Sequence, residues 1–229
     1  MIAVLFLVAA ALLPPLILLR VVYRMDTVES EPGELLRSLF LRGVLAMVPI
    51  FFLELACDQF VDFFPFGSLA YLFLSYFVVP GFVEEGVKYR VLYGRTWNDG
   101  NFDYRFDAVV YAVFVSLGFA AVENIMYVMT TGFGTAVMRA LFSIPGHAMF
   151  GVVMGVGYGA AKALEAQGEP HRAALRRRRA WIAAAILHGF YDFLLVGFGW
   201  VFYLYFLGML ILVVRLLKRC SGEDEPVNS

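Results

Sequence analysis

The sequence predicts an all-α membrane protein, a polytopic helical bundle with about seven transmembrane helices. Of its 229 residues, 61% are hydrophobic and 16% are charged, and its mean hydropathy is +0.76. This composition is too apolar for a soluble domain of that length. Seven apolar stretches are each long enough to cross about 30 Å of hydrocarbon as a helix.

The expected spans follow one another with short polar loops between them. They run approximately over residues 2–23, 38–57, 67–92, 107–130, 135–161, 180–197 and 199–216. The first lacks the basic start of a signal peptide, and its apolar run continues well past any small-residue cleavage site. We therefore expect it to remain as a helix kinked at Pro14-Pro15. We expect a single domain over 1–217, with its motif-bearing core at 67–197, and a flexible cytosolic tail over 218–229.

The distribution of basic residues predicts the orientation. With the N-terminus outside, the inner loops are 24–37, 93–106 and 162–179, together with the tail from 215. Every Lys and Arg except Arg139 lies in these regions or at the helix ends beside them, and the outer loops hold none. The positive-inside rule therefore places the C-terminus in the cytosol. The four arginines at 176–179 are an orientation anchor in this interpretation, so no nucleic-acid partner is expected.

Ionisable side chains inside the spans are the strongest indication of function, because a charge at bilayer depth is costly unless it is paired or faces water. The third span carries Glu84, Glu85 and Lys88. Helical spacing lets Lys88 neutralise one carboxylate and leave the other as a base or ligand. Pro80-Gly81 is expected to break this helix, which would let its backbone line a cavity. The structural alternative is a buried Glu–Lys pair.

The fourth and fifth spans add one ionisable group each. Glu123 follows Gly118 and two alanines, which permit close helix packing, and the adjacent Asn124 can donate a hydrogen bond. His147 lies in the fifth span, and Gly151 one turn later leaves room beside the imidazole for substrate or water. Either Glu123 or His147 could instead make a simple interhelical hydrogen bond.

The sixth span carries His188 and Asp192, four residues apart on one helix face. Asp192 can orient the imidazole and fix its tautomer, or both side chains can bind one metal ion. Zn²⁺ accepts His and carboxylate ligands in an open tetrahedral site, and a structural His–Asp hydrogen bond is the alternative. A carboxylate pair, a third carboxylate and two histidines on four spans together indicate an active site or an ion site.

Four motifs in this order resemble the PrsW family of bacterial intramembrane proteases, which is distantly similar to the CAAX prenyl endopeptidases and the bacteriocin-processing proteases. They are E-E-x-x-K (Glu84, Glu85, Lys88), F-x-x-x-E-N (Phe119, Glu123, Asn124), H-x-x-x-G (His147, Gly151) and H-G-x-Y-D (His188, Gly189, Tyr191, Asp192). The resemblance covers residues 80–196. Glu123 stands where CAAX-type enzymes usually carry His, so their mechanism does not transfer directly.

The resemblance implies an intramembrane endopeptidase of the bacterial cell membrane, with a single-pass membrane protein such as an anti-sigma factor as its substrate. We expect a water nucleophile activated by Glu84 or Glu85 and tuned by Lys88. His147 and His188 would hold a catalytic metal or the oxyanion, with Glu123 and Asp192 completing the shell. The expected metal ligands are Glu85, Glu123, His147 and His188. Zinc suits this set, and a metal-free glutamate mechanism is equally open.

A proton- or cation-coupled transporter is the competing interpretation, because intramembrane carboxylates and histidines also relay protons. It predicts an inverted repeat, and the polar residues on the third to sixth spans do not divide into matching halves. A third interpretation is a non-enzymatic scaffold, in which the polar residues would be individually dispensable.

Overall fold

The chain folds as a bundle of helices. The computed structural model describes residues 2–222 and 224–228. Its elements are α1 (Ile2–Tyr23), α2 (Gly33–Val61), α3 (Leu69–Phe73), the π-helical turn η1 (Leu74–Val78), α4 (Val79–Thr96), α5 (Asp107–Thr131), α6 (Phe133–Leu141), α7 (Ser143–Ala166), α8 (Pro170–Gly197) and α9 (Trp200–Gly222). Within the described residues, seven helical stretches are long and apolar enough to cross a membrane. The predicted fold class is confirmed.

Two of the seven spans consist of more than one helical segment. The elements α3, η1 and α4 form the continuous span Leu69–Thr96, and α6 with α7 forms the span Phe133–Ala166. Gly132, with a φ of 88°, separates α5 from α6. A left-handed φ is reached easily only by glycine, so the chain turns sharply here with no loop between the spans.

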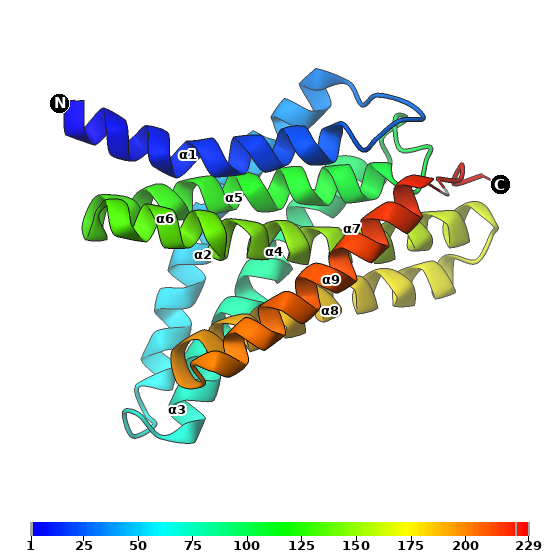
Figure 1. Cartoon of the computed structure of the whole chain (residues 1–229). Coiled ribbons are helices and arrows are strands. Elements are labelled where there is room, and N and C mark those ends of the chain that lie inside the picture. The colour runs from blue at the N-terminus through cyan, green and yellow to red at the C-terminus, as the bar shows by residue number, and fades with distance from the viewer. Residues whose placement is uncertain (1, 223, 229) are drawn as a thin grey trace.

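The inner helices are α5 and α7. In α5, 72% of an 18-residue apolar stretch is buried inside the bundle. The corresponding share is 17% in α1 and 17% in α9. Figure 1 shows α1 lying along α5 and α9 crossing the bundle obliquely, while α2 and α3 extend away from the other helices at one end. Large apolar side chains are exposed along α1, α2 and α9, as expected for surfaces that contact lipid acyl chains.

The chain termini lie at opposite ends of the bundle (Figure 1), as an odd number of spans requires. We call one of these the C-terminal end of the bundle; it holds loops 24–32 and 97–106, the turn at 167–169 and the C-terminal residues. The other, called here the opposite end, holds loop 62–68 and the turns at 132 and 198–199.

The helix predicted to break at Pro80-Gly81 is continuous, so that expectation is wrong. The π-helical turn η1 runs directly into α4, and Pro80 is the second residue of α4, so the wider turn before it accommodates the proline without a break in the helix. The span also extends to Thr96 rather than 92, which moves Glu85 close to its middle.

The tail begins later than expected, because α9 continues to Gly222. Beyond it, the Val227 side chain is 2% exposed and its backbone N–H donates to the Asp103 carbonyl at 2.7 Å. Flexibility of the tail from residue 218 stays a prediction, as does the single-domain organisation.

Candidate active site

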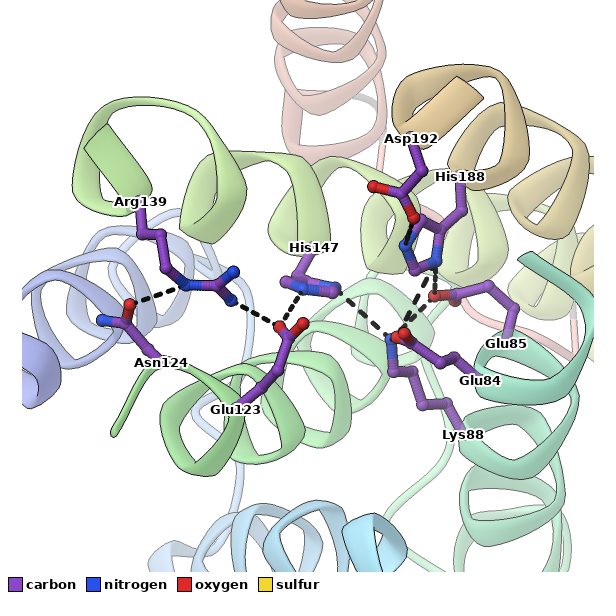
Figure 2. Close-up of polar contacts among 9 residues, drawn as sticks. All are labelled: Glu84, Glu85, Lys88, Glu123, Asn124, Arg139, His147, His188 and Asp192. Carbon is purple, nitrogen blue, oxygen red and sulfur yellow. Dashed lines mark hydrogen bonds and ion pairs between the residues drawn. The ribbon is translucent and has the colours of Figure 1, made fainter. Parts of the chain in front are cut away.

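Polar side chains from five helices meet inside the membrane-spanning part of the bundle (Figure 2). The structure brings together all seven residues that the sequence singled out: Glu84, Glu85, Lys88, Glu123, His147, His188 and Asp192. They come from α4, α5, α7 and α8, and α6 contributes one further side chain. A cavity of about 890 Å³ opens beside them.

Lys88 holds both carboxylates of α4. Its Nζ lies 2.9 Å from Glu84 Oε2 and 2.8 Å from Glu85 Oε1, and its side chain is 1% exposed. Lys88 therefore contacts both carboxylates, although its single positive charge can balance only one of their two negative charges. Residues three and four positions apart share one helix face, so the buried ammonium reaches both carboxylates.

His188 is placed between carboxylates on both sides. Its Nδ1 lies 3.0 Å from Glu85 Oε1 and 3.9 Å from Glu84 Oε2, and its Nε2 lies 3.2 Å from Asp192 Oδ2. Asp192 is one turn later on α8 and reaches only the ring nitrogen directed away from α4. This contact orients the imidazole and keeps Nδ1 directed at the carboxylate pair.

His147 repeats this arrangement from α7. Its Nε2 lies 2.9 Å from Glu123 Oε2, and its Nδ1 lies 3.4 Å from Lys88 Nζ. An ammonium can only donate, so Nδ1 accepts from Lys88 and the proton on Nε2 is donated to Glu123. In both histidines a carboxylate binds the outer nitrogen and Nδ1 faces the Glu84–Glu85–Lys88 cluster.

The donors at the centre are suitable for a metal ion. Glu84, Glu85, His147 and His188 each offer one ligand atom, and these atoms lie within 4.8 Å of one another. Two imidazole nitrogens and two carboxylate oxygens are a ligand set typical of Zn²⁺. The second oxygen of Glu85 is buried without a hydrogen-bond partner among the described residues. The residues present thus fit a metal, with Glu84 in the place that we expected for Glu123.

Glu123 is instead held by a residue that the sequence analysis did not select. Arg139 of α6 donates from Nη2 to Glu123 Oε2 at 2.6 Å and from Nε to Asn124 Oδ1 at 2.9 Å. Asn124 in turn donates to the Ala11 carbonyl of α1 at 2.7 Å, as its sequence position allowed. The available signal was charge: Arg139 is the one basic residue away from the inner loops, and an isolated intramembrane cation requires a partner.

Close helix approaches bring these side chains together. A Cβ on Gly189 would lie 2.5 Å from the Phe77 carbonyl oxygen, and one on Gly81 would lie 2.5 Å from the Ala185 carbonyl oxygen. Only glycine permits α8 to pack this tightly on η1 and α4, which sets the distance between His188 and Glu85. Gly151 was expected to leave room beside His147. That expectation is wrong, because a Cβ there would meet Ser116 of α5 at 3.0 Å.

The cavity connects the site with the opposite end of the bundle. Near the site it is lined by Glu84, Glu123, His147, His188 and Asp192. It continues to residues at the helix ends beside loop 62–68 and the turn at 132, which are Asp58, Asp62, Tyr71 and Thr130. Glu85 does not line it and is 0% exposed.

Comparison with known proteins identifies relatives along nearly the whole chain. Residues 31–216 match the family described as PrsW family intramembrane metalloprotease. The chain is 34% identical to the protease PrsW of Geobacillus kaustophilus over 96% of its own length and 94% of that protein. It is 36% identical to the protease PrsW of Shouchella clausii, over 94% and 97% respectively, and 32% identical to that of Bacillus subtilis, over 86% of both. No solved structure matches the chain.

Proposed function

Since the chain belongs to the PrsW family and is a membrane protease, we propose that it hydrolyses a peptide bond of a membrane-protein substrate with a water molecule activated by Glu84. The observation that carries the choice of Glu84 is its position. Of the two adjacent carboxylates, Glu84 lines the cavity and Glu85 does not. A general base must reach the proton that it removes, and only Glu84 meets this requirement.

The remaining residues divide into two roles. Lys88 and His188 bind the carboxylate pair and set the position and charge of Glu84. Glu123 and Asp192 bind the outer nitrogens of the two histidines and hold their Nδ1 atoms toward the centre. Glu84 takes a proton from water as the water oxygen attacks the scissile carbonyl carbon. It then returns the proton to the leaving amine, while the cationic groups around it stabilise the oxyanion.

We assign Glu84, Glu85, His147 and His188 as the residues that would hold a metal, and zinc as the ion that suits their chemistry. A bound zinc ion would polarise the substrate carbonyl and lower the pKa of water. Lys88 lies in the same cluster and pairs with Glu84 Oε2 and Glu85 Oε1. These two oxygens cannot both pair with the ammonium and bind a metal ion. A metal requires Lys88 to release at least one of them.

The substrate in this proposal is a single-pass membrane protein, with an anti-sigma factor as the candidate that the family suggests. The cavity reaches the opposite end of the bundle, where loop 62–68 carries no basic residue. The positive-inside rule makes this the outer side of a bacterial cell membrane. The substrate segment would therefore enter the site from that side.

The test is cleavage by the purified full-length protein in liposomes containing a candidate single-pass substrate, with fragments identified by mass spectrometry. Glu123→Ala and His188→Ala should each reduce cleavage on the order of 10²-fold or more, because Glu123 positions His147 and His188 positions the carboxylate pair. Glu34→Ala is the matched control, since Glu34 is exposed at the C-terminal end of the bundle. Wild-type activity in both site variants would contradict the assignment.

A further inference from the structure

A second cluster of acidic side chains lies far from the candidate active site. Asp26 is in the loop after α1, Asp107 is the first residue of α5, and Asp224 follows α9. One carboxylate oxygen of each lies within 4.8 Å of the other two. Asp107 is 16 residues before Glu123 on the same helix, which places the cluster about 24 Å from Glu123 along α5.

Backbone amides hold two of these carboxylates in place. Asp107 Oδ2 accepts hydrogen bonds from the Asp103 and Tyr104 N–H groups at 3.1 and 2.7 Å, and Asp224 Oδ1 accepts from the Phe106 N–H at 3.0 Å. The C-terminal residues are docked beside them, because the Arg105 N–H donates to the Glu225 carbonyl at 3.1 Å. The main chain of loop 103–106 therefore positions two of the three carboxylates, which come from segments distant in sequence.

Asp26 has no such donor. It is 7% exposed, and neither of its carboxylate oxygens has a hydrogen-bond partner in the described part of the chain. Leaving a buried carboxylate without a partner is costly, and the group is directed at two further carboxylates. Glu31, itself 5% exposed, adds a fourth acidic group beside Asp107.

No basic side chain pairs with this cluster within residues 2–222 and 224–228, although the charge of Arg105 acts on Asp224. None of the ion pairs formed there joins Asp26, Asp107 or Asp224 to a Lys or Arg side chain. The nearby Arg105 guanidinium is 2.7 Å from the Glu225 carboxylate. Burial, with the charges of Asp224 and Glu29 added, raises the pKa of Asp26 to about 6, as expected where a counter-charge is lacking.

We propose that Asp26, Asp107 and Asp224 bind a hard divalent cation, Mg²⁺ or Ca²⁺, which fastens the C-terminal residues to the loop after α1 and to the start of α5. An all-oxygen set of three carboxylates is the donor chemistry that these two ions select, with water or backbone carbonyls completing the shell. The cation would join the ends of α1, α5 and α9. The inference does not depend on the proposed catalytic function.

Hydrogen–deuterium exchange of the purified full-length protein in detergent tests the site, with EDTA compared against Mg²⁺ or Ca²⁺ at equal ionic strength. A cation at ten times its Kd should slow exchange in segments 24–31, 101–107 and 220–228 by up to about tenfold. Asp26→Asn and Asp224→Asn should each remove this protection. Glu34→Gln, an equal charge change at an exposed position of the same bundle end, should keep it.

Glu84→Gln should also retain the protection, because a loss there would place the cation in the active site. If Asp26→Asn does not fold, Asp224→Asn decides the question, since it changes only the segment after α9. Exchange that is the same in EDTA and in both cations would overturn the proposal. Equal cation-dependent protection in wild type and Asp224→Asn would overturn it as well.

Discussion

Arg139 supports the active site without lying in any of the four motifs. Its guanidinium binds Glu123 Oε2 at 2.6 Å, and the same oxygen lies 2.9 Å from His147 Nε2. We therefore regard Arg139 as a positioning residue that fixes Glu123, which in turn fixes the His147 ring. Small displacements of a positioned group can cost on the order of 10²-fold in rate.

Arg139→Met should lower kcat for substrate cleavage by about tenfold or more, because Glu123 loses the group that fixes it and the His147 ring is then less well held. Arg139→Lys should restore part of kcat, since it keeps a cation near Glu123. Arg172→Met is the control, as it removes another Arg–Glu pair at an exposed position. An unchanged kcat in Arg139→Met would show that Glu123 needs no such support.

Metal removal tests whether Glu84, Glu85, His147 and His188 hold a zinc ion. We expect about one zinc ion per chain in active protein, loss of activity on chelation, and recovery when zinc is added back. His188→Ala should lower the metal content, because it removes one of four ligands. Elemental analysis alongside the cleavage assay measures both. Full activity in metal-free protein would show that Lys88, and not a metal ion, supplies the positive charge of the site.

The types of residue in the site could be predicted from the sequence, but their partners could not. Glu84, Glu85, Glu123 and His188 were recognisable because ionisable groups are rare in apolar spans. Which nitrogen of each histidine faces inward depends on helix rotation, and helix rotation depends on packing between helices distant in sequence. For this reason only the structure shows that Glu84, and not Glu123, lies close enough to Glu85, His147 and His188 to share a metal ion with them.

At the scale of elements, the contact of α8 with η1 determines the distance between His188 and the carboxylates. Gly189→Ala should lower the stability of the protein by about 1–3 kcal/mol, because its Cβ would lie 2.5 Å from the Phe77 carbonyl oxygen. It should also reduce cleavage, since α8 carries His188 next to this position.

Gly208→Ala on α9 is the matched control, with no heavy atom within 4 Å of the added Cβ. Thermal unfolding in detergent measures stability, and the cleavage assay measures activity. Equal behaviour of the two variants would show that the approach of α8 to η1 does not limit the site.

The helices themselves were predictable in number and type but less so in their ends. Apolar length alone gave all seven spans, whereas α2 extends from 33 to 61 rather than from 38 to 57. The exposed polar residues at the ends of α2, such as Glu34 and Gln59, remain helical beyond the apolar run, and a hydropathy pattern does not record this. The π-helical turn before Pro80, where α8 packs closely at Gly189, likewise has no counterpart in the hydropathy pattern.

At the scale of the whole molecule, the account predicts one orientation in the membrane. Phe66 is 89% exposed in loop 62–68, and Gln167 is exposed in the turn after α7. In a background without Cys57 and Cys220, Phe66→Cys should react with an impermeant maleimide on intact cells. Gln167→Cys should react only after permeabilisation, because its side of the bundle carries the basic loops. Labelling of Gln167→Cys on intact cells would show that the protein has the opposite orientation in the membrane.

The central claim is that Glu84 activates the water that cleaves the peptide bond, and cleavage of a reconstituted single-pass substrate by two isosteric variants tests it most directly. Glu84→Gln keeps the size of the side chain but cannot accept a proton, so the single-turnover rate should fall by about 10²-fold or more. Glu85→Gln, which does not line the cavity, should retain more activity than Glu84→Gln. Full activity in Glu84→Gln with loss of activity in Glu85→Gln would contradict the account.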